Sequence, residues 1–429
     1  MQKYGLIGYP LKHSFSIGYF NEKFKAENID AEYVNFEIPR IEDFMEVIEE
    51  NPNLCGLNVT IPYKEQVIPY LDELDKDTAK IGAVNVIKIV RLPKGKIKLI
   101  GCNSDIIGFT QSIEPLLQPQ HKKALILGTG GASKAVYRGL ENLGIESTFV
   151  SRTKKDDKFL TYGELTPEIM AGHTVIVNCT PVGMFPKLEG APIDLAPFSR
   201  LTFVVDAIYN PLRTRLLQQA QDLGIPCANG LRMLVAQAKA AAEHFLGAPL
   251  PDAGTDRVYG ELAREMRSLA LIGMPSCGKT TLGRLLAAHM GRELVDLDEK
   301  IARDAGLSIP EIFAREGETG FRARETAALR EVAGRQGLLI ATGGGIVKNP
   351  ENVRLLRANA AVCFVQRDLA RLSSADPSRP LSTSAEALAR MYAERLPLYT
   401  AAADFSVSNE GAAEETARAI EDQFKEMCR

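Results

Sequence analysis

The chain has 429 residues, of which 45% are apolar and 24% are charged, and its net charge is −3. This ordinary globular composition excludes a collagen, a coiled coil and an extended disordered chain. At roughly 100–200 residues per domain, the length predicts two to four domains. The near balance of 51 basic and 54 acidic residues gives no sign of a nucleic-acid-binding surface.

Neither a leader nor a membrane anchor is expected. No apolar run reaches the roughly 18–20 residues that span a bilayer, and residues 1–10 lack an apolar signal-peptide region. The cysteines are scattered without a C-x-x-C pair, which disfavours a disulfide framework or a zinc site and fits a reducing compartment. We therefore expect a cytoplasmic enzyme acting on small molecules. The cysteines are Cys55, Cys102, Cys179, Cys227, Cys277, Cys363 and Cys428.

The basic residues change type along the chain. Residues 1–255 contain 19 Lys and 8 Arg, whereas residues 256–429 contain 4 Lys and 20 Arg. This shift indicates two modules of separate origin. Residues 247–256 are rich in Pro, Gly and Asp, which predicts a linker, and residues 257–267 could form a short bridging helix.

Both modules alternate short β-branched runs with helical patterns, which predicts parallel α/β folds. In the first module we expect a helix at 39–48 and strands at 4–8, 31–36, 56–61, 123–127, 147–150, 174–178 and 203–208. In the second we expect strands at 268–272, 338–341 and 361–365, and helices at 282–290 and 320–334.

Small polar side chains recur near the start of the first module. Ser14 and Ser16 alternate as on one face of a strand, and so do Asn58 and Thr60. Repeated hydroxyl and amide groups suit a substrate rich in hydroxyls. Polar edge strands explain either segment alone equally well, and Lys64 by itself would be a surface lysine.

A glycine-rich turn follows the predicted strand at 123–127. Glycines in Gly128–Gly131 permit a tight turn and let backbone N–H groups approach a pyrophosphate at a helix N-terminus. The next strand ends in Ser151–Lys155, whose basic and hydroxyl groups suit the 2′-phosphate of NADP rather than the ribose of NAD. A solvated basic turn is the alternative, because Asp156 and Asp157 follow.

Residues 1–247 resemble shikimate dehydrogenase. The matching motifs are Gly8–Ser16, Gly56–Glu65, Gly82–Asn85, Gly101–Asp105, Gly128–Ser133, Asn178–Met184, Asp206–Pro211 and Asn229–Gln237. The resemblance implies NADPH-dependent reduction of 3-dehydroshikimate to shikimate, with Lys64 and Asp105 as the catalytic pair. Asp105 would orient the Lys64 ammonium towards the carbonyl oxygen of the substrate. The family often has Pro and His within the segment that here reads Ser16–Asn21, and their loss could change its rigidity.

The same resemblance implies the binding residues of the first module. Substrate contacts fall on Ser14, Ser16, Asn58, Thr60, Lys64, Asn85, Asp105, Tyr209 and Gln237. NADP contacts fall on Gly128, Thr129, Gly130, Gly131, Ala132, Ser151, Arg152, Thr153, Lys154, Ala207 and Gly230.

The second module contains a phosphate-binding pattern. Gly273–Thr280 fits G-x-x-x-x-G-K-[ST] between a predicted strand and a predicted helix. Lys279 would reach the β/γ-phosphates, and the Thr280 hydroxyl would bind Mg²⁺. Asp296 and Asp298 lie on one predicted strand-end face and suit the metal and an acceptor hydroxyl. An acidic helix start explains such a pair equally well. Arg322, in a predicted helix opening, suits capture of a carboxylate, although a solvated charge is the commoner role of a lone arginine.

Residues 268–425 resemble shikimate kinase, which transfers the γ-phosphoryl group of ATP to the 3-hydroxyl of shikimate. The matching motifs are Gly273–Thr280, Asp296–Asp298, Ile312–Arg322, Gly343–Gly345, Ser378–Leu381 and Glu394–Tyr399. The resemblance implies a catalytic Lys279, metal residues Thr280 and Asp296, and a lid at about 372–385. The implied shikimate contacts are Asp298, Arg322, Gly344 and Arg395, and the implied ATP contacts are Pro275, Ser276, Cys277, Gly278, Lys279, Thr280, Thr281 and Arg379.

One departure concerns the adenine. The family often has an arginine after its last strand, where this chain has Ser406–Gly411. The sequence therefore predicts phosphoryl-transfer chemistry more firmly than it predicts the affinity for ATP or the preference among nucleotides.

Together the resemblances imply an α/β bifunctional enzyme. The first part, 1–247, would have a substrate lobe (about 1–105 and 235–247) and a Rossmann NADP-binding lobe (about 106–234). A linker at 248–267 would precede a P-loop α/β/α kinase domain of the nucleoside-monophosphate-kinase type at 268–429. Three alternatives stay open: an NAD-dependent quinate/shikimate dehydrogenase, a regulatory binding protein without catalysis, and a chain with one live and one inert module.

Overall fold

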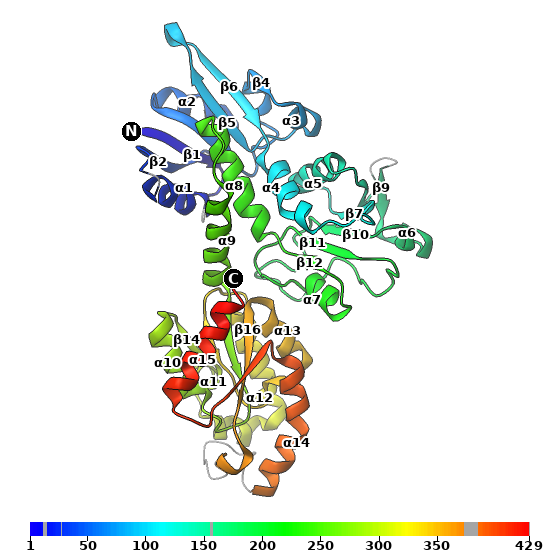
Figure 1. Cartoon of the computed structure of the whole chain (residues 1–429), viewed down its shortest axis with the longest axis vertical. Helices are drawn as coiled ribbons and strands as arrows, with labels where there is room; N and C mark the ends of the chain where they lie inside the picture. The colour runs from blue at the N-terminus through cyan, green and yellow to red at the C-terminus, as the bar shows by residue number, and fades with distance from the viewer. Residues whose placement is uncertain (12–14, 27, 155–157, 373–384, 429) are drawn as a thin grey trace. The chain divides into compact units, whose positions relative to one another are not determined.

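The computed structural model describes residues 1–429 except 12–14, 27, 155–157, 373–384 and 429 (Figure 1). Contacts divide the chain into two compact units. The first contains Met1–Thr180, Leu195–Ala207 and Ala220–Val258, and the second contains Pro181–Asp194, Ile208–Gln219 and Tyr259–Arg429. The domain boundaries implied by the resemblances stay a prediction.

The first sheet of the first unit is mixed. Its order is β2-β1-β3-β5-β6-β4, with β1 parallel to β2 and β3, and β5 antiparallel to β3 and β6. The strands are β1 (Gln2–Gly8), β2 (Ala31–Glu37), β3 (Leu54–Val59), β4 (Glu73–Leu74), β5 (Val86–Arg91) and β6 (Ile97–Cys102). The helices of this part are α1 (Phe15–Ala26), α2 (Phe44–Glu50), α3 (Lys76–Ile81), α4 (Ser104–Ile113) and α8 (Leu231–Leu246).

The second sheet of this unit is fully parallel. Read from β9, its order β9-β8-β7-β10-β11-β12 is the doubly wound order 3-2-1-4-5-6, which reverses between β7 and β10. Strands β10 and β11 are buried along their whole length, as expected for a sheet covered on both faces. The elements are β7 (Lys123–Leu127), α5 (Gly131–Asn142), β8 (Glu146–Ser151), β9 (Phe159–Thr161), α6 (Pro167–Gly172), β10 (Val175–Asn178), β11 (Phe203–Asp206) and β12 (Cys227–Ala228). Helix α7 (Arg215–Asp222) lies between β11 and β12 in the chain, and its residues up to Gln219 belong to the second unit.

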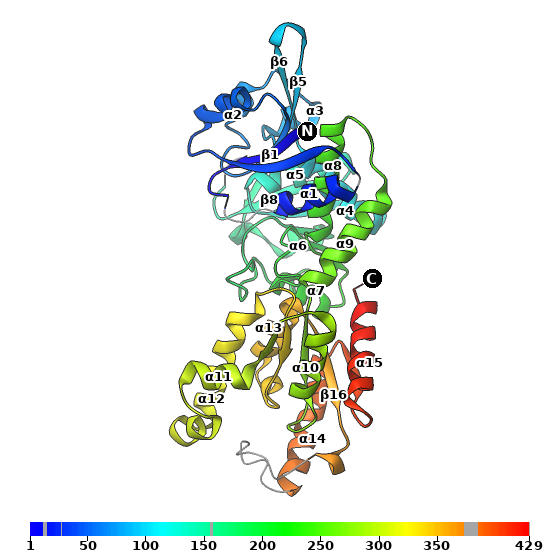
Figure 2. The same ribbon diagram turned by 90° about the vertical axis from the view of Figure 1, so that its left-hand side faces the viewer.

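The second unit contains a parallel five-stranded sheet of order β14-β15-β13-β16-β17. Helix α10 packs against α15, as Figure 2 also shows, and α12 packs against α13. The strands are β13 (Ser268–Ile272), β14 (Leu294–Asp296), β15 (Leu339–Ala341), β16 (Ala360–Gln366) and β17 (Phe405–Ser408). The helices are α10 (Lys279–Met290), α11 (Leu297–Ala305), α12 (Ile309–Ala333), α13 (Pro350–Asn359), α14 (Ala385–Ala402) and α15 (Ala413–Glu426).

The predicted α/β class is confirmed, and all ten predicted strands are present within a few residues. Two local predictions were wrong: Ser16 lies in helix α1 rather than on a strand, and Asp298 lies in the first turn of α11 rather than at a strand end. The predicted helix at 39–48 is present with shifted bounds, since it begins as a 3₁₀ turn at Ile41 and ends at Glu50. The predicted bridging helix at 257–267 is also present, as part of α9 (Asp252–Met266), which begins inside the predicted linker.

Within the described part of the chain, no helix is both long and apolar enough to cross a membrane.

Candidate active sites

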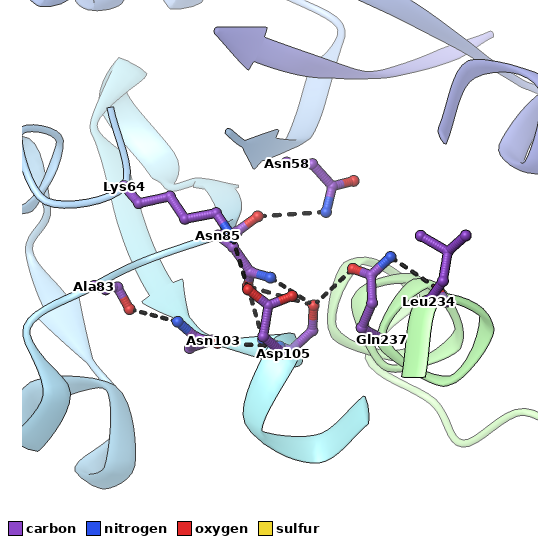
Figure 3. Close-up of polar contacts among 9 residues, drawn as sticks. Asn58, Lys64, Ala83, Asn85, Asn103, Asp105, Leu234 and Gln237 are labelled. Carbon is purple, nitrogen blue, oxygen red and sulfur yellow. Dashed lines mark hydrogen bonds and ion pairs between the residues drawn. The ribbon is translucent and has the colours of Figure 1, made fainter. Parts of the chain in front are cut away.

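A lysine and an aspartate meet at the edge of the first sheet. Lys64 follows β3, and Asp105 lies in the first turn of α4, where the Asn103 side chain accepts a hydrogen bond from its backbone N–H. The Lys64 Nζ lies 2.7 Å from Asp105 Oδ2, and the side chains are 25% and 15% exposed. Figure 3 shows the pair beside Asn85. The pair is therefore partly shielded but open to a ligand.

Amide and hydroxyl groups surround this pair. Asn58 Nδ2 donates to the backbone oxygen of Asn85 (3.4 Å), and Asn85 Nδ2 donates to Ser104 Oγ (3.1 Å). Ser104 Oγ in turn lies 3.4 Å from Gln237 Oε1 on α8 (Figure 3). One network thus joins three predicted substrate residues that are far apart in the sequence, through a buried serine that was not predicted.

The remaining predicted substrate residues are placed as follows. Thr60 directly follows β3 and packs against Gly8, where an added Cβ would lie 2.4 Å from Thr60 Cγ2. Ser16 hydrogen-bonds to Tyr33 from helix α1. Tyr209 is 38% exposed and belongs to a segment of the second unit, so its substrate contact stays a prediction. Ser14 lies outside the described residues.

The glycine turn after β7 fits a dinucleotide. Gly128 has a φ of +103°, and an added Cβ on Gly130 or Gly131 would meet nothing within 4 Å. Helix α5 begins at Gly131, so its free backbone N–H groups face this open space. Thr129 lies in the same turn, and Ala132 is the second residue of α5. The local geometry therefore suits a pyrophosphate.

The predicted cofactor site has two further parts, the basic turn Ser151–Lys154 and the residues Ala207 and Gly230. The basic turn Ser151–Lys154 follows β8, and Lys154 Nζ lies 3.3 Å from Glu164 Oε1, which leaves Arg152 as the better candidate for a 2′-phosphate. Thr153 accepts a hydrogen bond from the Ser151 hydroxyl through its backbone oxygen. An added Cβ on Gly230 would lie 2.0 Å from the Ala207 oxygen, so these two predicted residues are in close backbone contact.

The second unit has a cavity of about 310 Å³ beside the loop that follows β13. Lys279 is buried there, and its Nζ donates to the oxygens of Gly273 (2.9 Å) and Met274 (2.8 Å). Gly278 has a φ of +100°, a conformation that glycine adopts without strain. The lining comprises Ser276, Gly278, Lys279, Thr280, Thr281, Asp298, Thr342, Gly344 and Arg367.

Two other predicted ATP residues, Pro275 and Cys277, belong to this loop and are held by neighbouring segments. An added Cβ on Gly344 would lie 2.6 Å from Pro275 Cδ, so the loop rests on the glycine turn. Asn409 Nδ2 donates to the Cys277 oxygen at 2.8 Å, which fixes the loop from the Ser406–Gly411 segment.

The residues predicted to serve the metal are together. Thr280 Oγ1 donates to Asp296 Oδ2 at 2.7 Å, and Asp296 also caps α11 by accepting from the backbone N–H groups of Asp298 and Glu299. A hydroxyl and a carboxylate are oxygen ligands of the kind Mg²⁺ prefers, with water and phosphate oxygens completing its shell. The donor set therefore fits Mg²⁺ held together with a nucleotide.

The predicted acceptor residues surround the turn Gly343–Gly345. An added Cβ on Gly343 would lie 2.9 Å from Asp298 Oδ1, and one on Gly345 would lie 2.2 Å from Arg322 Nη2. Arg395 Nη1 donates to the Gly344 oxygen at 2.9 Å, and the Tyr399 hydroxyl donates to the same oxygen. The structure thus brings together all four predicted kinase-side substrate residues.

Arg322 pairs with a buried glutamate, Glu325, that was not predicted. Arg322 Nη1 lies 2.9 Å from Glu325 Oε2, and Glu325 is fully buried. Burial raises the pKa of Glu325 from 4.5 to about 7, and the Asp298 charge acts in the same direction, against the lowering effects of Arg322 and Arg395. Burial outweighs the ion pair here, because the carboxylate has lost its water.

This shift predicts a pH-dependent stability of the second unit. The folded pKa lies above the unfolded one, so the folded state binds the proton more tightly and stability falls as the pH rises from about 4.5 to about 7. Between these two pH values, we expect the Glu325 carboxyl to lower the free energy of unfolding by about 3 kcal/mol. Glu325→Gln should abolish this decrease. Denaturant unfolding at both ends of this window measures it. Glu331→Gln, which alters an exposed partner of Lys300, is the control. The same pH dependence in wild type and Glu325→Gln would contradict the assignment.

The predicted lid at about 372–385, with Arg379, lies almost entirely outside the described residues. The described residues missed by sequence reasoning are Ser104, Glu325, Arg367 and Tyr399. Glu325 had one available signal, since it stands three residues after Arg322 on a helix.

The folds and sites define the chain as a dinucleotide-dependent oxidoreductase joined to a P-loop phosphotransferase. Residues 6–87 match the shikimate dehydrogenase substrate binding domain, and residues 275–425 match shikimate kinase. The chain is 36% identical over 256 residues to a shikimate dehydrogenase (NADP(+)) of Caldicellulosiruptor saccharolyticus, which covers 56% of this chain and 90% of that protein. The chain belongs to the shikimate dehydrogenase family and carries, in addition, a shikimate kinase domain.

Solved structures give the same result for the dehydrogenase part. A chorismate mutase/shikimate 5-dehydrogenase fusion protein from Clostridium acetobutylicum superposes with a TM-score of 0.55 at 34% identity, covering 61% of this chain and 97% of that one. Shikimate 5-dehydrogenase from Thermus thermophilus, in complex with NADP(H) and shikimate, has a TM-score of 0.53 at 26% identity, covering 61% of this chain and 99% of that one.

Proposed function

We propose that this chain catalyses two consecutive reactions of aromatic amino acid biosynthesis. The first is NADPH-dependent reduction of 3-dehydroshikimate to shikimate, and the second is Mg²⁺- and ATP-dependent phosphorylation of shikimate to shikimate 3-phosphate. One observation carries the proposal: each candidate site pairs a lysine with the groups its chemistry needs, Lys64 with Asp105 and Lys279 with a phosphate loop facing Asp298.

In the reduction, NADPH supplies the hydride to the carbonyl carbon. Asp105 accepts a hydrogen bond from Lys64 and holds its ammonium in place, so that another N–H can donate to the carbonyl oxygen as negative charge develops there. The amides of Asn58 and Asn85 and the side chain of Gln237 orient the ring hydroxyls.

In the phosphorylation, Arg322 and Arg395 hold the ring carboxylate, and Asp298 accepts a hydrogen bond from the acceptor hydroxyl. Lys279 exchanges its bonds to Gly273 and Met274 for bonds to phosphate oxygens. The hydroxyl created by the reduction is the one that the phosphorylation esterifies. The product of the first site, shikimate, is therefore the substrate of the second.

Steady-state assays of the two half-reactions test this proposal. NADPH consumption with 3-dehydroshikimate and ADP release with shikimate should both be detected in one purified protein. Preference for NAD with quinate would instead favour a quinate/shikimate dehydrogenase, and failure of both reactions would favour a non-catalytic binding protein. Activity in only one assay would identify an inert module.

Cofactor choice can be tested at the basic turn. Arg152→Gln should raise the KM for NADPH about tenfold, because it removes a charge-assisted hydrogen bond to the 2′-phosphate, and should leave the KM for NADH unchanged. Lys123→Gln, at the opposite end of β7, is the matched control. Equal effects of Arg152→Gln on both cofactors would contradict the role.

The proposal also includes a cytoplasmic location. All seven cysteines are free, as suits a reducing compartment.

A further inference from the structure

Tyr33 lies behind the candidate dehydrogenase site, in the aromatic core of the first sheet. It is 1% exposed and stacks on Phe20 with ring centroids 4.6 Å apart and planes 3° apart. Phe20 belongs to the segment in which this chain departs from the family pattern. This packing leaves the Tyr33 ring little freedom to move.

The hydroxyl of Tyr33 joins two residues of the predicted substrate site. It donates to Asn58 Oδ1 at 2.7 Å and hydrogen-bonds to the Ser16 side chain. Burial raises the pKa of the Tyr33 hydroxyl, so it stays protonated and available as a donor. A serine from α1 and an asparagine from β3 are therefore fixed through one buried atom.

This contact determines which way the Asn58 amide points. Because Oδ1 accepts from Tyr33, Nδ2 faces the other side, where it donates one hydrogen to the Asn85 oxygen. The second Nδ2 hydrogen is left to donate to an oxygen of the ligand. A flipped amide would set its two N–H donors against the Tyr33 hydroxyl and place Oδ1 near the Asn85 carbonyl.

We propose that Tyr33 is a positioning residue for the dehydrogenase substrate, holding Ser16 and Asn58 in the orientation in which they bind its oxygens. This inference rests on the proposed function. It predicts an effect on substrate binding from a hydroxyl that touches neither substrate nor cofactor.

Tyr33→Phe and Tyr4→Phe form a matched pair. Tyr4 belongs to the same core cluster, with its ring 5.1 Å from Phe245, but its hydroxyl donates to Gln2 (3.1 Å) and not to a predicted site residue. Tyr33→Phe should raise the KM for 3-dehydroshikimate about tenfold, with a smaller change in kcat and none in the KM for NADPH. Tyr4→Phe should alter none of these, and melting temperatures of both variants report any common effect on the core.

A double-mutant cycle with Asn58→Ala tests the route of the effect. Because Tyr33 acts through Asn58 as well as Ser16, Tyr33→Phe should raise the KM clearly less in the Asn58→Ala background than in the wild type, and the part that remains is the effect through Ser16. Equal KM values for the two tyrosine variants, or fully multiplying effects in the cycle, would overturn the proposal. Absence of dehydroshikimate turnover by the wild type would instead contradict the proposed function itself.

Discussion

Replacing Lys64 by alanine will lower the kcat of dehydroshikimate reduction by about two to four orders of magnitude, the usual contribution of a positioned proton donor. The structure gives the reason, because the Lys64 ammonium is held 2.7 Å from Asp105 at the edge of the amide network. Steady-state NADPH consumption measures this loss. The rate of shikimate phosphorylation should be unchanged.

The control for this variant is Lys98→Ala, which removes an exposed lysine paired with Glu73 on the same sheet. It should retain both activities. A Lys64→Ala enzyme that keeps more than about a tenth of its reductase kcat would show that another group polarises the carbonyl.

Lys279→Ala should have the reciprocal effect, lowering the kinase kcat about 100-fold or more while sparing reduction. The buried Lys279 ammonium is the one cation of the loop, and its present partners are two backbone oxygens that phosphate oxygens can replace. ADP release measures the loss. Lys425→Ala, on the exposed face of α15, is the control. Loss of both activities in Lys279→Ala would contradict independent chemistry at the two sites.

Sequence patterns predicted the elements of both parallel sheets well. Strand β13 is buried along its whole length and β16 is buried up to its last residue, and both are nearly continuous apolar runs, so few alternatives exist. Prediction failed where two signals competed. Gly254 disfavours a helix, yet the Asp252 end of α9 is fixed by Lys239 and its Asp256 by Arg232, contacts that depend on tertiary structure.

The candidate sites divide in the same way. The pairs Lys64–Asp105 and Thr280–Asp296 were predicted because motif positions specify them, and the structure places their atoms within hydrogen-bonding distance. Ser104 and Glu325 were missed, because the sequence does not distinguish a buried serine or glutamate from an exposed one, even where the spacing of Glu325 from Arg322 indicates an ion pair. Their roles depend on desolvation, which only the folded structure shows.

The most direct test follows one ring through both reactions. The purified chain is given 3-dehydroshikimate, NADPH deuterated at its transferable position and Mg-ATP, and the products are identified by mass spectrometry. The account predicts shikimate 3-phosphate that carries the deuterium. Deuterated shikimate that stays unphosphorylated, or dehydroshikimate left unreduced, would contradict it.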